Sequence, residues 1–411
     1  MRKTDDELSK LCQKLKIDKL WSWSRYHTYK EDKWTFFLKY VLGEEEDKTN
    51  SIYAISGGNV HDIIEKFYLN KIKYEDMIEK YEDELFAMNC AELKYDRNDS
   101  EKNDKISNKY ENCIRHFFKN HNVITAPHKV EEFIKVKIAD NIYMQGYIDF
   151  MYTEDSEDVD GNKISKIHIV DWKTSTRYTG EKINKECGQL LIYAEGIRQL
   201  FDIPLSRIVC EWNFLKYVTV AYKQANGKIK ERHIERNVIG ESLVNTVKMW
   251  LTKLGYEEDM EKYIDEMVLN NNLECLPEDV RSKFYIKDCY VQVPLIEEKI
   301  EELKQDIIET VNEINHKEEE YQKTKDENIF WQDVTENDEY RLAVLSGYSR
   351  NKHKPYDAYL TEKEMFLNNN EIDEDVLDEL INESSNDKDN KNDSNIMNED
   401  DKEFLDFLNS L

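Results

Sequence analysis

The chain has 411 residues, of which 86 are acidic and 58 basic, so its formal net charge is −28. This length allows a sizeable core in one to three domains, and the scarcity of glycine and proline favours helices over an all-β sandwich. The sequence contains no apolar run of the ~18 residues that cross a membrane, and its N-terminus lacks the apolar segment of a secretory signal. Seven scattered cysteines without a CxxC pair are typical of reduced thiols, so we expect a cytoplasmic protein.

The acidity by itself argues against a nucleic-acid partner, because proteins that bind phosphate backbones are usually basic. The charge is uneven, however: residues 371–411 hold 15 acids against 3 bases. We therefore predict that 366–411 form an acidic disordered tail. This tail either only solubilises the protein or docks another protein.

Helical periodicity dominates residues 1–126, which we predict to be a helical N-terminal part. The predicted elements are helices over most of 1–42, a helix that starts after Gly57-Gly58, a polar loop at 91–108 and a helix around 108–120.

Alternating apolar residues predict strands within 127–240, which we take as the core domain. The first strands follow Pro127 and lead to a long hairpin loop at 154–163. A strand through Asp171 comes next, then a helix at about 181–201, and then strands at 207–223 and 227–236.

After residue 240 the sequence predicts helices again, so 241–365 are expected to form a helical C-terminal region. Within it, 295–321 repeat apolar residues every three to four positions with charges between them, which predicts a long amphipathic helix. This helix either packs against its own protein or forms the seam of a dimer.

Residues with catalytic potential concentrate between positions 129 and 193. Asp149 closes the strand that carries GYID, while Asp171 and Lys173 share one face of the following strand because strand side chains alternate. If these strands are neighbours, the two carboxylates converge into a hard-oxygen site suited to Mg²⁺ or Mn²⁺. Lys173 could then orient a water and stabilise charge on a phosphate. The structural alternative is a buried Asp–Lys ion pair.

The ordered set GxxD, DxK and QxxxY resembles the PD-(D/E)XK nuclease superfamily, in the branch of RecB-like and AddB-like exonucleases and the small exonucleases of CRISPR adaptation and phages. The resemblance implies an α/β restriction-endonuclease-like core, a mixed central sheet flanked by helices, with helical additions at both ends. It also implies metal-dependent hydrolysis of phosphodiester bonds.

The resemblance assigns roles to residues that match its motifs. Asp149 and Asp171 would bind the metal, and Lys173 would orient the nucleophile. Gln189 and Tyr193, which face the same way from one helix, would contact the substrate backbone. In GGNVHDIIE, His61 matches an upstream histidine that would be a further metal ligand; otherwise it is an ordinary helix histidine. Glu131 or Glu132 matches an acid on the first core strand, and the sequence does not decide between them.

The N-terminal stretch WSWSRYHTYKEDKWTFFLKYV is similar to the opening motif of the branch, through Ser22, Ser24, Arg25, Tyr29 and Phe37. Members with an iron–sulfur cluster place a cysteine shortly after this tyrosine and three more near the C-terminus. Neither region of this chain contains one, so we expect no iron–sulfur cluster.

These patterns predict a Mg²⁺- or Mn²⁺-dependent DNA nuclease, an exonuclease of DNA repair, recombination or phage DNA metabolism in a bacterial or phage-infected cell. DNA is the expected partner, a replication or recombination protein is a candidate partner for the acidic tail, and no membrane is expected. The alternative is a non-hydrolytic DNA-binding or adaptor protein that retains the fold. Basic residues that grip DNA or only face solvent cluster on one hairpin: Lys228, Lys230, Arg232, His233 and Arg236.

Overall fold

The structure is a computed structural model, and it describes residues 2–365 with the exception of 49–50, 98, 158–160, 162 and 225. The predicted acidic tail at 366–411 lies outside the described residues. Met1–Arg350 form one compact unit. Asn351–Leu411 form another, whose described part includes a short helix at 356–365.

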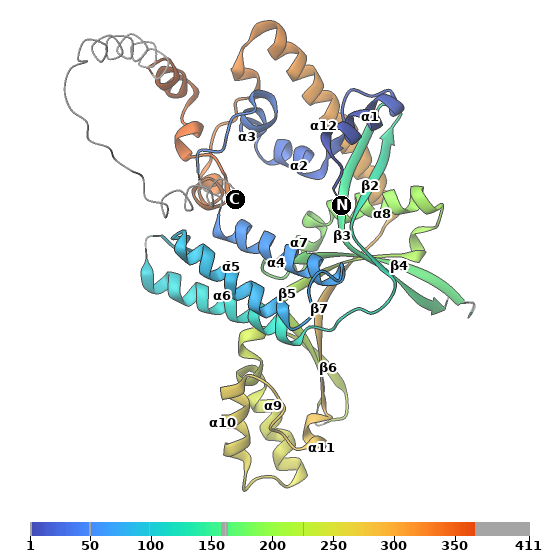
Figure 1. The fold of residues 1–411 in the computed structure, drawn as a ribbon, viewed down its shortest axis with the longest axis vertical. Coiled ribbons are helices and arrows are strands. Elements are labelled where there is room, and N and C mark those ends of the chain that lie inside the picture. The colour runs from blue at the N-terminus through green and yellow to red at the C-terminus, as the bar shows by residue number, and fades with distance from the viewer. Residues whose placement is uncertain are drawn as a thin grey trace, which may run out of the picture. The chain divides into compact units, whose positions relative to one another are not determined.

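A seven-stranded mixed sheet lies at the centre of the first unit (Figure 1). The strand order is β1-β3-β4-β5-β6, with β2 added to β3 and β7 added to β5. Strand β3 pairs antiparallel with β4, and β4 pairs parallel with β5. The predicted α/β fold with a mixed central sheet is therefore confirmed. The strands are β1 (Trp21–Ser22), β2 (His128–Ala139), β3 (Ile142–Glu157), β4 (Lys163–Lys173), β5 (Ile208–Lys223), β6 (Ile229–Glu235) and β7 (Phe284–Val293).

Helices cover both faces of this sheet. The α-helices are α1 (Asp5–Leu15), α2 (Trp23–Glu31), α3 (Lys33–Phe36), α4 (Ile52–Tyr68), α5 (Asp76–Cys90), α6 (Ser100–Asn120), α7 (Glu181–Glu186), α8 (Gly188–Phe201), α9 (Ile239–Leu254), α10 (Met260–Asn270), α11 (Glu278–Arg281) and α12 (Glu297–Thr324). Val170 and Trp172 of β4 pack into an apolar cluster with α4, α5 and α6. The opposite face meets α8, where the thiol of Cys210 contacts the carbonyl of Leu190. Because side chains alternate along β4, Asp171 points to the α8 side.

Strand β5 joins the part of the sheet that contains β3 and β4 to a smaller lobe. Its first part pairs with β4, its last part pairs with β6, and β7 runs along its other edge. The far end of β5 carries α9, α10 and α11, which share their own apolar cluster (Figure 1). The strand β7 was missed by the sequence, which predicts helices after residue 240. Its apolar run is short and lies between helices, so periodicity alone does not separate it from a helix.

Three element boundaries also differ from those predicted. Helix α4 begins at Ile52, before the two glycines, because Ser51 caps it and Ile52 is buried. Helix α6 begins at Ser100, inside the predicted loop, because the side chain of Asp99 accepts a hydrogen bond from the Lys102 amide. Strand β3 extends to Glu157, beyond the predicted start of its hairpin loop.

The apolar face of the long amphipathic helix α12 packs against its own protein. It contacts α2, α8 and β2. The hydroxyl of Tyr29 donates to Glu313 at 2.7 Å, and Lys30 pairs with Asp306 at 2.8 Å. The predicted helix is thus confirmed, with bounds a few residues later than expected.

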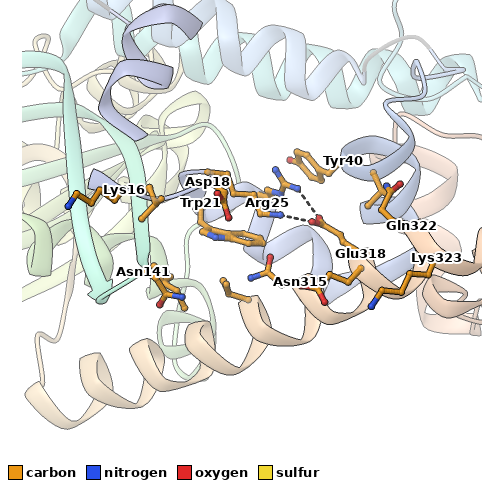
Figure 2. Close-up of a pocket in the computed structure, with 16 residues that line it drawn as sticks. Lys16, Asp18, Trp21, Arg25, Tyr40, Asn141, Asn315, Glu318, Gln322 and Lys323 are labelled. Carbon is orange, nitrogen blue, oxygen red and sulfur yellow. Dashed lines mark hydrogen bonds and ion pairs between the residues drawn. The ribbon is translucent and has the colours of Figure 1, made fainter. Parts of the chain in front are cut away.

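The N-terminal motif lies against the C-terminal half of α12. Ser22 caps α2 by accepting from the Arg25 amide, and the Arg25 guanidinium pairs with Glu318 at 3.1 Å. A cavity of about 800 Å³ lies between the motif and α12, and Arg25 and Glu318 are among its lining residues (Figure 2). Lys19 pairs with Glu318 as well. The motif therefore holds two distant parts of the chain together.

None of the described helices is long and apolar enough to span a membrane.

Candidate active site

Two carboxylates converge at neighbouring strand ends. Phe150 and Val170 are partners in the β3–β4 register, so Asp149 and Asp171 lie opposite each other one residue further on. The ammonium nitrogen of Lys173 lies 2.6 Å from Oδ2 of Asp171. Asp171 is buried, whereas the other two side chains are partly exposed. The convergence expected from the strand pattern is present.

His61 reaches this point from α4. Its Nδ1 lies 3.4 Å from Oδ2 of Asp149, and its Nε2 lies 2.9 Å from the carbonyl oxygen of Trp172. Because a carbonyl only accepts, Nε2 carries the hydrogen. The Trp172 amide also donates to Asp149 at 3.3 Å. The backbone of Trp172 therefore orients both residues, a role that its side-chain identity does not reveal.

The pKa values of the site residues are shifted because like charges lie close together where little solvent reaches them. Burial raises the pKa of Asp149 well above its usual value, and the charge of Asp171 raises it further. Burial lowers the pKa of His61, so the neutral imidazole is favoured. Burial opposes the charge of Lys173, but its two carboxylate neighbours outweigh this and raise the pKa of the lysine. The site thus holds more negative charge than its own residues neutralise.

Helix α8 brings the QxxxY pair to the same place. The amide of Gln189 donates to the hydroxyl of Tyr193 at 2.9 Å. Burial raises the pKa of Tyr193 to about 12, and Asp149 and Asp171 contribute. Gly146 permits this approach, since a Cβ atom there would lie 2.6 Å from the Tyr193 ring.

The two candidate glutamates of β2 differ in their position relative to the strand-end site. Val130 and Glu132 pair with Phe150 and Ile148, the residues on either side of Asp149, so Glu131 lies opposite Asp149. Glu131 has a φ of 49°, a left-handed conformation that is uncommon for a residue other than glycine. It is therefore Glu131 that faces the site, and its strained backbone is a signal that the sequence does not carry.

The partners of these glutamates differ as well. Glu132 pairs with Lys129 three residues away at 2.7 Å, as surface charges often do. Glu131 pairs with Arg2 at 2.9 Å. Arg2, from the start of the chain, is a neighbour of the site that no sequence pattern indicated.

The donor chemistry fits a hard divalent cation. Asp149, Asp171 and Glu131 offer carboxylate oxygens and His61 offers an imidazole nitrogen, which are ligand types that such a cation takes. In the part of the chain that the structure describes, however, no group of three or more His, Cys, Asp or Glu side chains is arranged to hold a metal ion. Asp171 is paired with Lys173, whereas Asp149 accepts from the Trp172 amide and lies beside Nδ1 of His61.

The basic hairpin residue Arg236 has a structural role. It is 1% exposed and forms an ion pair with Asp288, so it is not available to grip DNA. Lys228, Lys230 and Arg232 are exposed.

A family model of the PD-(D/E)XK nuclease superfamily matches residues 20–328 of the chain. No curated protein gives a significant match. The matched segment contains β1 to β7 and all the site residues described above except Arg2. It covers well over half of the chain. The chain therefore belongs to the PD-(D/E)XK nuclease superfamily.

Proposed function

We propose that the protein is a metal-dependent DNA nuclease of the exonuclease type, acting in DNA repair, recombination or phage DNA metabolism. The observation that supports this proposal is the convergence of Asp149 and Asp171 beside Lys173. Two neighbouring carboxylates, one of them with a pKa that burial raises, and a nearby ammonium match the demands of phosphodiester hydrolysis better than those of a structural ion pair.

Each residue has a role that its position allows. Asp149, Asp171 and His61 would hold Mg²⁺ or Mn²⁺, with Glu131 as a further carboxylate. The cation would supply Lewis-acid activation of the phosphate. Lys173 would orient the attacking water, whose oxygen forms the new P–O bond while the bond to the leaving oxygen breaks. Gln189 and Tyr193 would position the substrate backbone.

The test is digestion of linear and circular DNA, single- and double-stranded, with Mg²⁺ or Mn²⁺. An exonuclease digests only molecules with ends. Asp171→Ala and Lys173→Ala are expected to be inactive, while Glu132→Gln is a matched surface control that should digest as fast as the parent protein. If both site variants keep the parent rate, the assignment is wrong.

A second function, DNA binding without hydrolysis, is favoured by one observation. The described residues include no preformed group of three metal-binding side chains. An adaptor would bind DNA without binding Mg²⁺ through Asp149 and Asp171. Titration calorimetry with Mg²⁺ or Mn²⁺ separates the two functions, because only the nuclease should show heat that is absent from Asp171→Asn.

A further inference from the structure

A cavity of about 640 Å³ adjoins the strand-end site. Part of its lining is Thr174, Ser175 and Thr176, which follow Lys173 directly in the chain. Ala54 of α4 contributes as well, and His61 follows seven residues later on the same helix. At 1.5 Å per residue these two positions are about 10 Å apart. A strand of DNA rises 3.4 Å per nucleotide, so the cavity lies within about three nucleotides of the site.

Lys216 of β5 also lines this cavity, and none of the described carboxylates lies within ion-pair distance of its ammonium. Its ammonium lies 5.1 Å from the centre of the Tyr110 ring. The structure gives it no carboxylate partner among the residues it describes, although the chain holds 86 acids against 58 bases. Burial lowers the pKa of Lys216, and the charge of Glu235, which pairs with Lys109 instead, opposes this only in part. Such a group is costly to keep unless a ligand supplies the missing charge.

The rest of the lining suits an anion with several oxygen atoms. The cavity contains two lysines and one glutamate, and that glutamate, Glu235, is taken by Lys109 at 2.9 Å. Ser51 and the three residues after Lys173, all of which carry a hydroxyl group, belong to the same lining. A cation surrounded by hydroxyl donors is the usual environment of a backbone phosphate in protein–DNA contacts.

We propose that this cavity binds a backbone phosphate of the DNA strand whose scissile bond lies at Asp149 and Asp171, with Lys216 as its cationic contact. The proposal rests on the proposed function, because it assumes that a DNA strand occupies the strand-end site. Beyond that function, the proposal specifies the path of the DNA strand, which runs from the end of β4 over the end of β5. It also explains a lone lysine within an apolar strand sequence.

The experiment measures binding of fluorescein-labelled oligothymidylate in EDTA, where hydrolysis is absent, by anisotropy over a range of KCl concentrations. Each phosphate contact with a single strand contributes about 0.7 to the slope of log K against log salt concentration. We expect Lys216→Gln to bind more weakly and to lower this slope by about 0.7. Lys216→Arg, which retains the charge, should keep the parent slope.

The matched control is Lys283→Gln. Lys283 is also partly buried over an aromatic ring, 5.5 Å from the centre of Trp250, but it does not line this cavity. Its variant should bind like the parent protein. If Lys216→Gln unfolds, Lys216→Met keeps the aliphatic stem on Tyr110 and serves the same measurement.

Two outcomes overturn the proposal: an unchanged slope in the neutral variants of Lys216, or an equal loss in Lys216→Arg. Neither outcome depends on hydrolysis. Failure of the protein to digest DNA in Mg²⁺ or Mn²⁺ would instead contradict the proposed nuclease and leave the binding result standing.

Discussion

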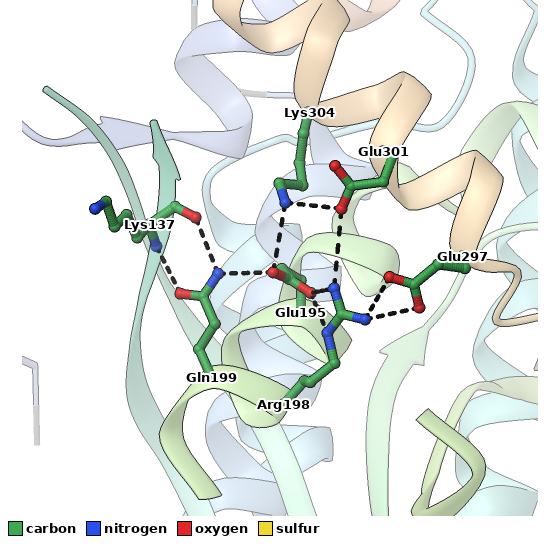
Figure 3. A network of polar contacts seen from close by, with 7 residues as sticks. All are labelled: Lys137, Glu195, Arg198, Gln199, Glu297, Glu301 and Lys304. Atoms are coloured by element: carbon green, nitrogen blue, oxygen red, sulfur yellow. Dashed lines mark hydrogen bonds and ion pairs between the residues drawn. The ribbon is translucent and has the colours of Figure 1, made fainter. Parts of the chain in front are cut away.

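Helix α8 takes part in two groups of charged and polar side chains. In one group the opposite charges are paired, and in the other, two like charges face each other. Its first half carries Gln189 and Tyr193 to the strand-end site. Its second half carries Glu195, Arg198 and Gln199 to a network that joins α8 to α12 and to the edge of β2 (Figure 3). The two groups have similar composition, so composition does not explain their difference.

In the α8–α12 network, opposite charges alternate in space. Glu195, which is 4% exposed, accepts from Arg198 at 2.6 Å and from Gln199 at 2.7 Å. Arg198 pairs in turn with Glu297, and Lys304 pairs with Glu301 at 2.8 Å. At the strand-end site, by contrast, Asp149 faces Asp171. A network with its charges matched stabilises the fold, whereas a site with unmatched charge is poised for a ligand.

The largest expected effect comes from removing charge where it is unmatched. Asp171→Asn should lower nuclease activity about 10³-fold, since a metal contact contributes several kcal/mol and each 1.4 kcal/mol is tenfold. Its free energy of unfolding should stay within about 1 kcal/mol of the parent, because repulsion from Asp149 is lost together with the pair to Lys173. Digestion rates and urea unfolding check both. If Asp171→Asn also unfolds more easily than the parent protein, Asp171 stabilises the fold and is not only a metal ligand.

The converse change is Glu195→Ala in the α8–α12 network. It leaves Arg198 and Lys304 without their buried partner, and breaking a buried pair from one side costs about 3 kcal/mol. Some of this is offset by Glu297 and Glu301, which remain. Urea unfolding measures the loss, and Glu301→Gln, at a side chain 54% exposed, is the control that should cost less than about 1 kcal/mol. Equal costs for the two variants would show that burial of Glu195 does not matter.

The sequence predicted the site better than its surroundings. Asp171 and Lys173 share a face by strand alternation, and Asp149 joins them because the strands that carry the aspartates are neighbours, as a hairpin connection favours. The choice of Glu131 over Glu132 depends on a positive φ at Glu131, which no sequence pattern predicts. The pair between Arg2 and Glu131 joins residues that are distant in the chain, so local periodicity contains no trace of it.

The same distinction holds for the fold. The helix α12 was predictable because its apolar repeat spans many turns. The strand β7 was not, because its identity depends on the free edge of β5 rather than on its own residues. Neither alternative for Arg236, a DNA contact or a charge that faces solvent, describes it, for a similar reason: it is buried against its partner Asp288, which lies on β7.

Metal addition sharpens the comparison in a single protein. A cation that binds only the folded state raises its stability, by about 2.7 kcal/mol at a hundredfold excess over Kd. We expect Mg²⁺ or Mn²⁺ to raise the unfolding midpoint of the parent protein and of Glu195→Gln, but not that of Asp171→Asn. Thermal unfolding with and without EDTA provides the measurement. Stabilisation of Asp171→Asn by the same amount would locate the cation elsewhere.

The smallest expected effect concerns the glycines rather than the charges. Gly146→Ala places a Cβ 2.6 Å from the Tyr193 ring, which must then move away from the two aspartates. Overpacking of this kind costs about 1–3 kcal/mol, and the displaced tyrosine should lower activity as well. Gly58→Ala is the matched control, because nothing lies within 4 Å of its Cβ and alanine in a helix is about 0.5–1 kcal/mol better than glycine. The two variants should therefore shift the unfolding midpoint in opposite directions. If Gly146→Ala keeps both its midpoint and its activity, the approach of α8 to the strand-end site does not depend on this glycine, and the two halves of α8 differ less than their contacts indicate.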